Sequence, residues 1–421
     1  MIGSHELQTW LTKLDNQHNQ EIQLGLTRVL SAAQRLKLLN PPSYVITIGG
    51  TNGKGATVAA LEAIYLAAGY DVASYTSPHL NCFNERIRLN KQPIANQDLV
   101  AAFKIIATLD NARELTYFET TTLAALWYFK QCEPAILLLE VGLGGRLDAT
   151  NIIDSDLTII TTVAKDHEAY LGNTIELIAY EKAGIMRHNK PCIYADKHAP
   201  QSLINHAQKL CCQLIRQDVD YTQKITSNAL ELSAHEFQIK IPHPKFHPNS
   251  ISAAIMAVRN MQNLLPVTDQ ALHQGLNNIH LDGRLHWLKT PKLCPCLIDV
   301  AHNPQAARYL ANYLVRYKPQ GKIYAIFSAL NDKKHEKIIE PFLPLVDEWL
   351  VVIMSSSRAA TAKQLQQAFA THGITQQICY SNFSLAMTMI EKKASSNDLI
   401  LIFGTFLLVS EALSYLEHGK I

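Results

Sequence analysis

A lysine within a glycine-rich segment is the residue of this chain best suited to do chemistry. Lys54 lies in the run Gly50-Thr-Asn-Gly-Lys-Gly55. Five β-forming residues, 44–48, and then Gly49 come before this run, and apolar side chains with helical spacing follow it at 58–68. Such a strand, loop and helix surround a phosphate with backbone N–H groups and the positive end of the helix dipole, while the lysine neutralises charge. The run therefore predicts a nucleoside triphosphate site, whose expected contacts are Asn52, Gly53, Lys54 and Gly55.

The glycine-rich run departs from the common phosphate-loop pattern in two places. Ile48 stands where the pattern has its first glycine, and Gly55 follows the lysine where serine or threonine is usual. The hydroxyl that normally binds Mg²⁺ is therefore missing from its usual position, because Ala56 comes next and Thr57 only after it. An ordinary tight turn is the alternative interpretation, but Lys54 together with the flanking strand and helix favours nucleotide binding.

Length and composition indicate a soluble protein of two domains. The 421 residues exceed one ordinary core, and 48% apolar with 18% charged residues is a normal globular composition. A formal net charge of +2 argues against a nucleic-acid surface. No apolar run approaches the ~18 residues of a transmembrane helix, and the N-terminal residues do not resemble a signal peptide, so we expect a cytoplasmic protein. The eight cysteines include no CxxC pair, and we expect reduced, mostly buried thiols rather than a metal or redox site.

Apolar strands alternate with helical patterns, which is typical of an α/β fold with a parallel sheet. After the phosphate loop, strands are expected at 71–77, 135–141 and 157–163, a proline-rich loop at 242–248, and helices at 249–262 and 268–279. A second series of strands is expected at 297–300, 322–327, 349–353 and 399–403, with helices between them, such as 361–371. We therefore predict an ATP-binding domain at 1–285, a linker at 286–296 and a smaller α/β domain at 297–421. The cleft between the domains is the expected active site.

Polar side chains at the carboxyl ends of the first strands are candidates for a metal site. Ser77, Glu140 and His167 each fall at or just past such an end, which is where ligands bind in parallel sheets. Mg²⁺ prefers few oxygen ligands from protein because it keeps waters and phosphate oxygens. A capped, solvated side chain is the alternative for any one of them. It fits Glu140 least, because a charge after three leucines is costly to bury without a partner.

Two further segments combine a turn with groups that could do chemistry. Arg146 and Asp148 follow three glycines at 142–145 and could form an ion pair within that loop. Asp299 and His302 lie between an expected strand and helix, and the alternative there is a helix capped by Asn303. Such a cap does not exclude function, since the turn also presents Asp299 and His302.

The motifs taken together resemble the folylpolyglutamate synthase/dihydrofolate synthase family within the wider Mur-ligase-like group. The resemblance spans nearly the whole chain, and its carriers are 22–28, 50–55, 76–79, 117–119, 140–151, 166–167, 181–185, 283–284 and 299–304. It implies a P-loop-containing Mur-ligase-like central domain with a mostly parallel sheet and a smaller Rossmann-like α/β C-terminal domain. It also implies an ATP-dependent ligase that turns a carboxylate into an acyl phosphate, which the amino group of L-glutamate then attacks.

The resemblance assigns roles to individual residues of this chain. The implied catalytic residues are Lys54, Lys182 and His302. The implied ATP contacts beyond the loop are Asn249, Arg284 and Asp299, and the implied Mg²⁺ ligands are Ser77, Glu140 and His167. The implied folate-side contacts are Gln23, Gly25, Glu119, Thr120, Arg146 and Asp148. The small-molecule partners would be ATP, L-glutamate and dihydropteroate or a reduced folate, bound by a monomer with two Mg²⁺ ions and possible use of a monovalent cation.

Lys182 has a special role in the relatives, where the matching lysine is carbamylated and helps to hold a second divalent ion. We expect the same modification here, and the alternative is a plain lysine paired with Glu181 or Glu176.

Departures from the family pattern leave other functions open. Gln23 and Thr120 replace residues of the bifunctional bacterial pattern on the folate side, so an enzyme with one of the two activities is an alternative. A Mur-type peptide ligase is less favoured, because only 43 residues precede the strand at Tyr44 and leave no room for a UDP-sugar domain. An inactive nucleotide-binding scaffold is a third alternative, motivated by Ala56, Gln23 and the pair Glu168-Ala169.

Overall fold

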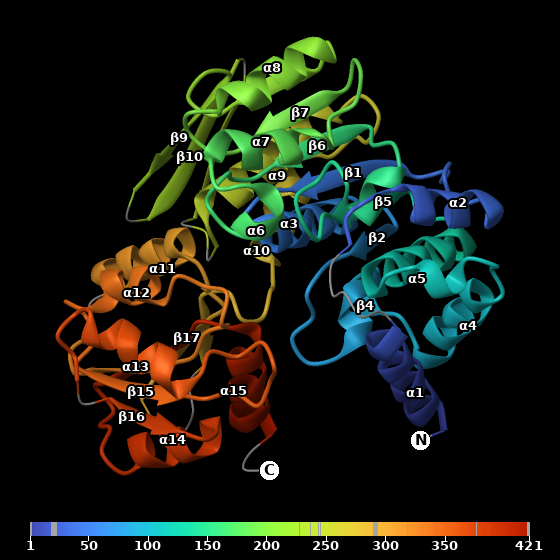
Figure 1. The fold of residues 1–421 in the computed structure, drawn as a ribbon. Coiled ribbons are helices and arrows are strands. Elements are labelled where there is room, and N and C mark those ends of the chain that lie inside the picture. Colours follow the sequence, from blue (N-terminus) through green and yellow to red (C-terminus); the bar gives the residue numbers. More distant parts are fainter. Residues whose placement is uncertain are drawn as a thin grey trace. The chain divides into compact units, whose positions relative to one another are not determined.

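The computed structural model describes residues 2–17, 23–226, 228–235, 237–242, 244, 246–288, 294–317, 319–375 and 377–418. The chain folds into two compact units, Met1–His280 and Leu281–Ile421. The fold is α/β in both units, with mostly parallel sheets (Figure 1).

The first unit is built on an eight-stranded sheet in the order β4-β3-β2-β5-β1-β6-β7-β8. Its strands are β1 (Tyr44–Gly49), β2 (Val72–Tyr75), β3 (Ile87–Leu89), β4 (Gln92–Pro93), β5 (Ile136–Glu140), β6 (Leu157–Ile160), β7 (Pro191–Tyr194) and β8 (Gln213–Arg216). The six strands from β2 to β8 in this order run parallel, and β3 and β4 add an antiparallel edge. All residues of β2, β5 and β6 are buried, as expected for strands covered on both faces.

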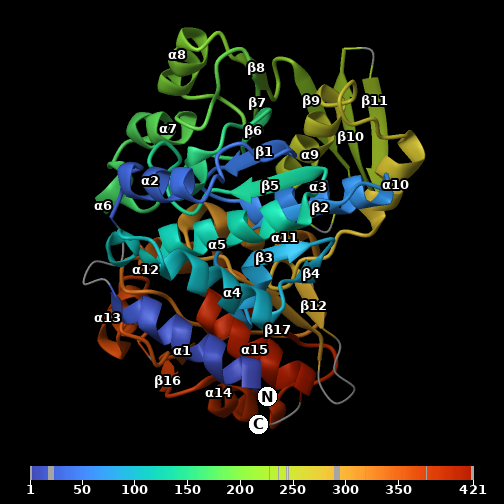
Figure 2. The ribbon, with the colours of Figure 1, turned by 90° about the vertical axis from the view of Figure 1, so that its right-hand side faces the viewer.

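Helices cover both faces of this sheet. They are α1 (Ile2–Gln17), α2 (Thr27–Arg35), α3 (Lys54–Ala67), α4 (Asn96–Ala107), α5 (Tyr117–Cys132), α6 (Glu168–Leu171), α7 (Ile175–Ala183), α8 (Gln201–Lys209), α9 (Pro248–Asn260) and α10 (Asp269–Asn277). One core joins α1, α2, α4 and α5 to a face that includes Val45 and Leu137, and α1, α4 and α5 lie side by side in Figure 2. A second core joins α7 and α8 to Ile160 and Cys192 of the same face. Helix α3 packs against α9, α10 and the central strands on the other face.

A small antiparallel sheet follows β8 and was not predicted. Its strands are β9 (Tyr221–Ile225), β10 (Ala229–Ala234) and β11 (Phe237–Pro242), in the order β11-β10-β9. The residues of β9 and β11 are mostly exposed or half-buried, so they lack the apolar run that marks the strands of the main sheet. The predicted loop at 242–248 begins at the last residue of β11, and His243 and Lys245 lie outside the described residues.

The second unit contains a six-stranded sheet in the order β12-β13-β17-β14-β15-β16. Its strands are β12 (His286–Leu288), β13 (Cys296–Asp299), β14 (Ile323–Phe327), β15 (Glu348–Val352), β16 (Ile378–Tyr380) and β17 (Leu399–Phe403). Its helices are α11 (Pro304–Tyr317), α12 (His335–Ile339), α13 (Ala362–Ala370), α14 (Phe383–Glu391) and α15 (Phe406–His418). The strands from β13 to β16 run parallel, and β12 pairs antiparallel with β13 at one edge.

The predicted linker at 286–296 needs correction. The two units divide between His280 and Leu281, and 286–288 form β12 within the second sheet. Strand β12 is only half-buried, so its sequence shows no continuous apolar run. Residues 289–293 of the predicted linker lie outside the described residues.

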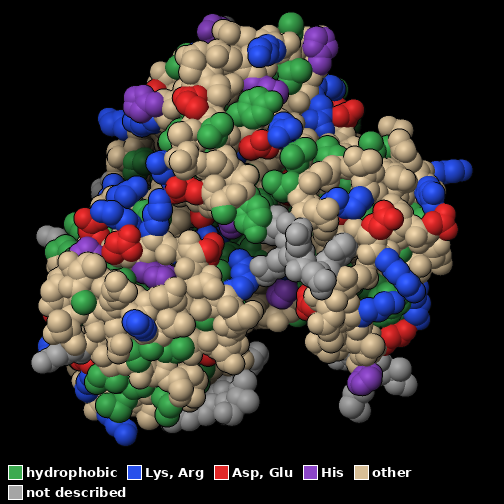
Figure 3. Space-filling model, viewed as in Figure 1, with side chains coloured by type: hydrophobic (Ala, Val, Ile, Leu, Met, Phe, Trp, Pro, Cys, Tyr) green, Lys and Arg blue, Asp and Glu red, His purple; other side chains and the backbone are tan. Residues whose placement is uncertain are grey.

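Three other expectations concern the chain as a whole. All eight cysteines lie among the described residues and are free thiols, but only Cys192, Cys294 and Cys296 are buried, so the prediction of mostly buried thiols is wrong. No helix in the described part of the chain has the length and apolar character needed to span a membrane. Positive and negative side chains are interspersed on the face shown in Figure 3, in keeping with the net charge of +2.

Candidate active site

The glycine-rich run forms the predicted strand–loop–helix unit. Strand β1 ends at Gly49 and α3 begins at Lys54, so the loop between them lies at the N-terminus of the helix. Gly53 precedes the helix with a φ of 92°, and a Cβ atom there would lie 2.6 Å from Ser250 Oγ. Because L side chains rarely adopt this conformation and no room exists for one, glycine is required at this position.

Two threonines directly after β6 form hydrogen bonds with the loop. The Asn52 N–H donates to Thr162 Oγ1 at 3.0 Å, and Thr161 Oγ1 donates to Asn52 O at 2.7 Å. The Thr51 N–H donates to Thr162 O at 2.8 Å. Sequence reasoning missed both threonines, because they lie about a hundred residues from the loop that they contact.

Lys54 and Thr57 serve different purposes at the start of α3. Lys54 Nζ donates to Gly50 O at 3.1 Å and to Thr51 O at 3.4 Å, so the ammonium group lies over the loop itself. Thr57 is fully buried, and its hydroxyl donates to Gly53 O at 3.0 Å. Thr57 therefore cannot replace the hydroxyl missing after Lys54, and a metal ligand must come from elsewhere.

The structure brings two of the three predicted metal ligands together. Glu140 is the last residue of β5 and is 5% exposed, and its Oε2 accepts from the Ser77 N–H at 3.2 Å. His167 has a φ of 50° just before α6, and its N–H donates to Asp166 Oδ1 at 2.9 Å. The role of His167 as a ligand stays a prediction.

The residues near Ser77 fit Mg²⁺ better than a transition metal. Within the described ranges, no three His, Cys, Asp or Glu side chains cluster in a way that would hold a metal ion. One buried carboxylate beside a serine suits an ion that keeps several waters and phosphate oxygens. A buried carboxylate is costly without partners, and a bound cation would add to the Ser77 N–H, which already donates to Glu140.

Lys182 lies in the last turn of α7, is only 4% exposed and shares its surroundings with Lys54. Burial, followed by the charge of Lys54, lowers the pKa of Lys182 to about 7, while Asp166 and Asp148 act in the opposite direction. The structure thus gathers the phosphate-loop lysine, a second lysine and two carboxylates into one electrostatic environment. Perturbed amines of this kind are concentrated at functional sites.

The alternative partners suggested for Lys182 are engaged elsewhere. Glu181 Oε1 accepts from Arg146 Nη2 at 2.8 Å. Glu176 accepts from the Ser202 N–H at 2.7 Å through Oε2. The interpretation of Lys182 as an ordinary lysine paired with Glu181 or Glu176 is therefore wrong.

Arg146 and Asp148 do not pair with each other, which corrects a second expectation. Asp148 caps the short helix η3 (Ala149–Ile152), where it accepts from the Leu143 N–H at 2.9 Å and from Thr150 Oγ1 at 2.7 Å. Burial raises the pKa of Asp148. Arg146 instead reaches Glu181, 35 residues away along the chain. Both residues hold the loop in shape, and their folate-side role stays a prediction.

Three of the other predicted folate-side residues, Gln23, Gly25 and Glu119, gather around one arginine. Arg28 Nε donates to Glu119 Oε2 at 3.2 Å, and Arg28 Nη2 donates to Gln23 O at 2.9 Å. Gly25 lies between Gln23 and Arg28 with a φ of 146°. Thr120 is 4% exposed, and its hydroxyl has no hydrogen-bond partner among the described residues. Arg28 was not singled out from the sequence, although it ends one of the motifs on which the resemblance rests.

Asn249 lies beside the phosphate loop, at the N-terminus of α9. Its Oδ1 accepts from Gln223 Nε2 at 2.6 Å, and its Nδ2 donates to Asp196 Oδ1 at 3.4 Å. The next residue, Ser250, donates from Oγ to Gly53 O at 3.2 Å. The structure therefore places Asn249 next to a residue that contacts the loop, and its role as a nucleotide contact stays a prediction.

Within the second unit, the predicted residues Arg284 and His302 lie beside Phe406, and Asp299 interacts with Arg284. Asp299 ends β13, and its Oδ2 accepts from the Leu285 N–H at 2.8 Å. Burial raises the pKa of Asp299, and the charge of Arg284 acts against this rise. Arg284 lies 5.3 Å from the centre of the Phe406 ring, and the ring of His302 lies 6.0 Å from it. The sequence did not predict that Phe406 would lie beside Arg284 and His302.

Both units of the chain match known protein families. Residues 48–268 match the Mur ligase middle domain, and residues 283–406 match the Mur ligase glutamate ligase domain. A dihydrofolate synthase/folylpolyglutamate synthase of Haemophilus influenzae is 37% identical over 429 aligned residues, covering 98% of each chain.

Solved structures agree over the same length. E. coli FolC in complex with DHPP and ADP has a TM-score of 0.92 and 35% identity, covering 98% of each chain. A bifunctional folylpolyglutamate synthase/dihydrofolate synthase with Mn, AMPPNP and L-glutamate bound has a TM-score of 0.89 and 37% identity, again over 98% of each chain. The chain described here therefore belongs to the dihydrofolate synthase/folylpolyglutamate synthase family of Mur ligases.

Proposed function

We propose that this chain is an ATP-dependent ligase that joins L-glutamate to the carboxylate of dihydropteroate and to the γ-carboxylate of reduced folates. One observation carries the proposal: Lys54 contacts the phosphate loop, and the buried Lys182 lies close enough to be affected by its charge. The similarity to bifunctional enzymes over 98% of the chain supports it.

The proposed reaction has two steps. A carboxylate oxygen of the pteroyl substrate attacks the γ-phosphorus of ATP, and ADP leaves with the electron pair of the broken P–O bond. The amine of L-glutamate then attacks the acyl carbon, loses a proton and expels inorganic phosphate. Phosphoryl transfer depends mainly on positioning and on neutralising charge.

The residues of this chain meet those needs in different ways. The N–H groups at the start of α3 and the ammonium of Lys54 bind the phosphates of ATP. Ser77 and Glu140 would hold Mg²⁺, with His167 as a further predicted ligand, and the bound ion would neutralise charge on the phosphate oxygens. Asn249, Arg284 and Asp299 keep their predicted place as ATP contacts, and His302 its predicted catalytic role.

We further propose that Lys182 is carbamylated. A free amine attacks the carbon of CO₂ and loses a proton to give a carbamate anion, and a pKa of about 7 leaves about half of the Lys182 amine free at neutral pH. A carbamate close to Asp148 and Asp166 needs a compensating cation, which is the reason to expect a second divalent ion. A ¹³C resonance that appears with labelled bicarbonate and is missing in Lys182→Ala would support the modification, and its absence from the wild type would overturn it.

The folate side is where bifunctional and single-activity enzymes would differ. Gln23, Gly25 and Glu119 lie around Arg28, and Thr120 adds a buried hydroxyl without a partner among the described residues. A buried hydroxyl of this kind is costly unless a ligand completes it. We therefore propose that these residues contact the pteroyl substrate. The monomeric state and a monovalent cation remain predictions.

Release of phosphate tests the proposed function. The protein is given Mg·ATP and L-glutamate, with dihydropteroate in one reaction and tetrahydrofolate in another, and controls lack glutamate. Glutamate-dependent release with both substrates supports the bifunctional proposal. Release with one substrate alone assigns a single activity, and no release with either while ADP still binds indicates a nucleotide-binding scaffold.

A further inference from the structure

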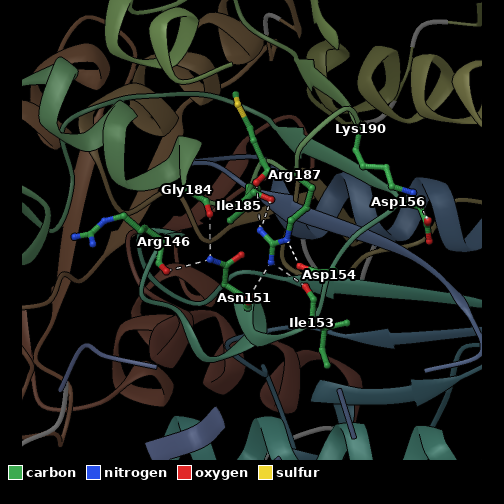
Figure 4. Close-up of polar contacts among 10 residues, drawn as sticks. Arg146, Asn151, Ile153, Asp154, Asp156, Gly184, Ile185, Arg187 and Lys190 are labelled. Atoms are coloured by element: carbon green, nitrogen blue, oxygen red, sulfur yellow. Dashed lines mark hydrogen bonds and ion pairs between the residues drawn. The ribbon is translucent and has the colours of Figure 1, made fainter. Parts of the chain in front are cut away.

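The C-terminal end of α7 is joined to the segment that follows β5 by a dense set of hydrogen bonds (Figure 4). The segment, residues 141–153, begins directly after Glu140, and α7 carries Lys182 in its last turn. The last carbonyl groups of a helix have no partners within the helix and must find them elsewhere. Here Lys182 O and Ala183 O accept from the N–H groups of Ile185 and Met186. The carbonyls of Glu181 and Gly184 instead accept from Arg146 and Asn151, more than thirty positions earlier in the chain.

Asn151 connects the two elements through its side-chain amide. Its Nδ2 donates to Arg146 O within the 141–153 segment at 3.0 Å and to Gly184 O after α7 at 3.1 Å. Both amide hydrogens are thus in use, which fixes the orientation of the amide, since a flipped group would set oxygen against two carbonyls. Figure 4 shows the Asn151 side chain between these two carbonyl groups.

Arg187 connects the same elements from the other side. Its Nη1 donates to Ile185 O at 2.9 Å and to Met186 O at 3.3 Å. Its Nη2 donates to Asn151 O at 2.8 Å and to Ile153 O at 3.1 Å. The guanidinium group therefore satisfies four carbonyls, two from the turn that follows α7 and two from the 141–153 segment, which a lysine could not do with its single nitrogen.

The backbones approach closely where these bonds form. A Cβ atom on Gly184 would lie 2.3 Å from Arg146 Cβ, and the Arg146 N–H donates to Glu181 O at 2.8 Å. The residue between Glu181 and Ala183 is Lys182, so this contact sets the position of the Lys182 backbone relative to the 141–153 segment.

We propose that Asn151 and Arg187 are positioning residues, which fix Lys182 relative to Glu140 and so set the spacing of the two groups on which divalent-ion binding depends. The proposal rests on the proposed function, in which both groups serve bound ions. Displacing catalytic groups by about 1 Å can cost on the order of 100-fold in rate. Neither residue touches the phosphate loop in the described contacts, so nucleotide affinity should be spared.

Two variants and a matched control test the proposal. Asn151→Asp keeps the shape of the side chain but sets an oxygen against the carbonyls of Arg146 and Gly184. Arg187→Lys keeps the charge and serves as the milder variant if the first fails to fold. Lys190→Ala is the control, because it removes the exposed ion pair with Asp156 in the same region, also visible in Figure 4.

The readouts are Mn²⁺ binding in the presence of ADP, followed by electron paramagnetic resonance, together with ADP affinity, kcat and melting temperature. We expect the wild type and Lys190→Ala to bind two ions. We expect both variants to keep ADP affinity within about twofold, to lose the second ion, and to lose on the order of 100-fold in kcat at temperatures well below melting.

The outcomes separate the two proposals. If the wild type binds one ion, the two-ion part of the proposed function fails, and the positioning role fails with it. If the wild type binds two ions and both variants also bind two with unchanged affinity, the positioning role alone is overturned. A loss of kcat that disappears when the variants are assayed at lower temperature would likewise overturn it, because such a loss reflects stability.

Discussion

Replacing Lys182 with methionine would separate the cost of burying an amine from its use in catalysis. The ordinary pKa of a lysine amine, 10.5, applies to the unfolded chain, whereas burial and the charge of Lys54 lower the pKa of Lys182 to about 7 in the folded chain. Between these values the unfolded chain binds more protons, so the cost of burial is greatest below about pH 7 and declines as pH rises. It amounts to about 4 kcal/mol at pH 7 and about 2 kcal/mol at pH 9, at ~1.4 kcal/mol per pKa unit.

Methionine has a similar length and carries no charge, so the variant should be more stable than the wild type at neutral pH. The apolar surface that methionine buries adds a free energy that does not depend on pH. The test is therefore how the difference in unfolding free energy between the variant and the wild type changes with pH. We expect the stability advantage of Lys182→Met to shrink by about 2 kcal/mol between pH 7 and pH 9. The same variant should have no measurable ligase turnover.

The assay is urea unfolding of ligand-free protein in CO₂-free buffer. Trp10 and Trp127 report on the first unit once Trp287 and Trp349 have been replaced by phenylalanine. Lys190→Met is the matched control, because it makes the same change of side chain at an exposed position. An advantage of Lys182→Met that is independent of pH would refute the assignment of Lys182 as a buried amine of lowered pKa.

Three further substitutions have distinct expected effects. Lys54→Ala should abolish turnover and weaken ATP binding, as measured by phosphate release and titration calorimetry, because the cation over the phosphate loop is lost. Glu140→Ala should abolish turnover with the circular dichroism spectrum unchanged, because a buried carboxylate at the proposed Mg²⁺ site is lost. If Lys54→Ala or Glu140→Ala kept most of its kcat, the roles assigned to these two residues would be contradicted. Gly53→Ala should weaken ADP binding and destabilise the first unit by about 1–3 kcal/mol in urea unfolding. The reason is that the new Cβ would meet Ser250 Oγ and that the φ of 92° is unfavourable for alanine. Unchanged ADP affinity would contradict the loop geometry.

The sequence predicted those features that depend on neighbours along the chain. The strand, loop and helix around Lys54 were predicted because turn residues and apolar spacing are local signals. Strands β5 and β6 were predicted because full burial gives continuous apolar runs. Strands β9 and β12 were missed, because exposed or half-buried strands carry no such signal.

Contacts between distant segments could not be predicted in the same way. The sequence suggested that Arg146 pairs with the nearby Asp148, but the chain reverses direction and brings Glu181 to Arg146 instead. The bracing of the phosphate loop by Thr161 and Thr162 was missed for the same reason. Pairings of this kind follow from the register of the sheet and the packing of helices, which composition and spacing do not encode.

The central claim is that an acyl phosphate joins ATP cleavage to amide formation, and the fate of the carboxylate oxygens tests it most directly. Dihydropteroate with ¹⁸O in its carboxylate is incubated with Mg·ATP, L-glutamate and the protein, and the released phosphate is analysed by mass spectrometry. One labelled oxygen per phosphate released is the predicted result, because the oxygen that attacks phosphorus leaves with it. Amide product accompanied by unlabelled phosphate would contradict the acyl phosphate, and the absence of both products would contradict the ligation of glutamate to dihydropteroate.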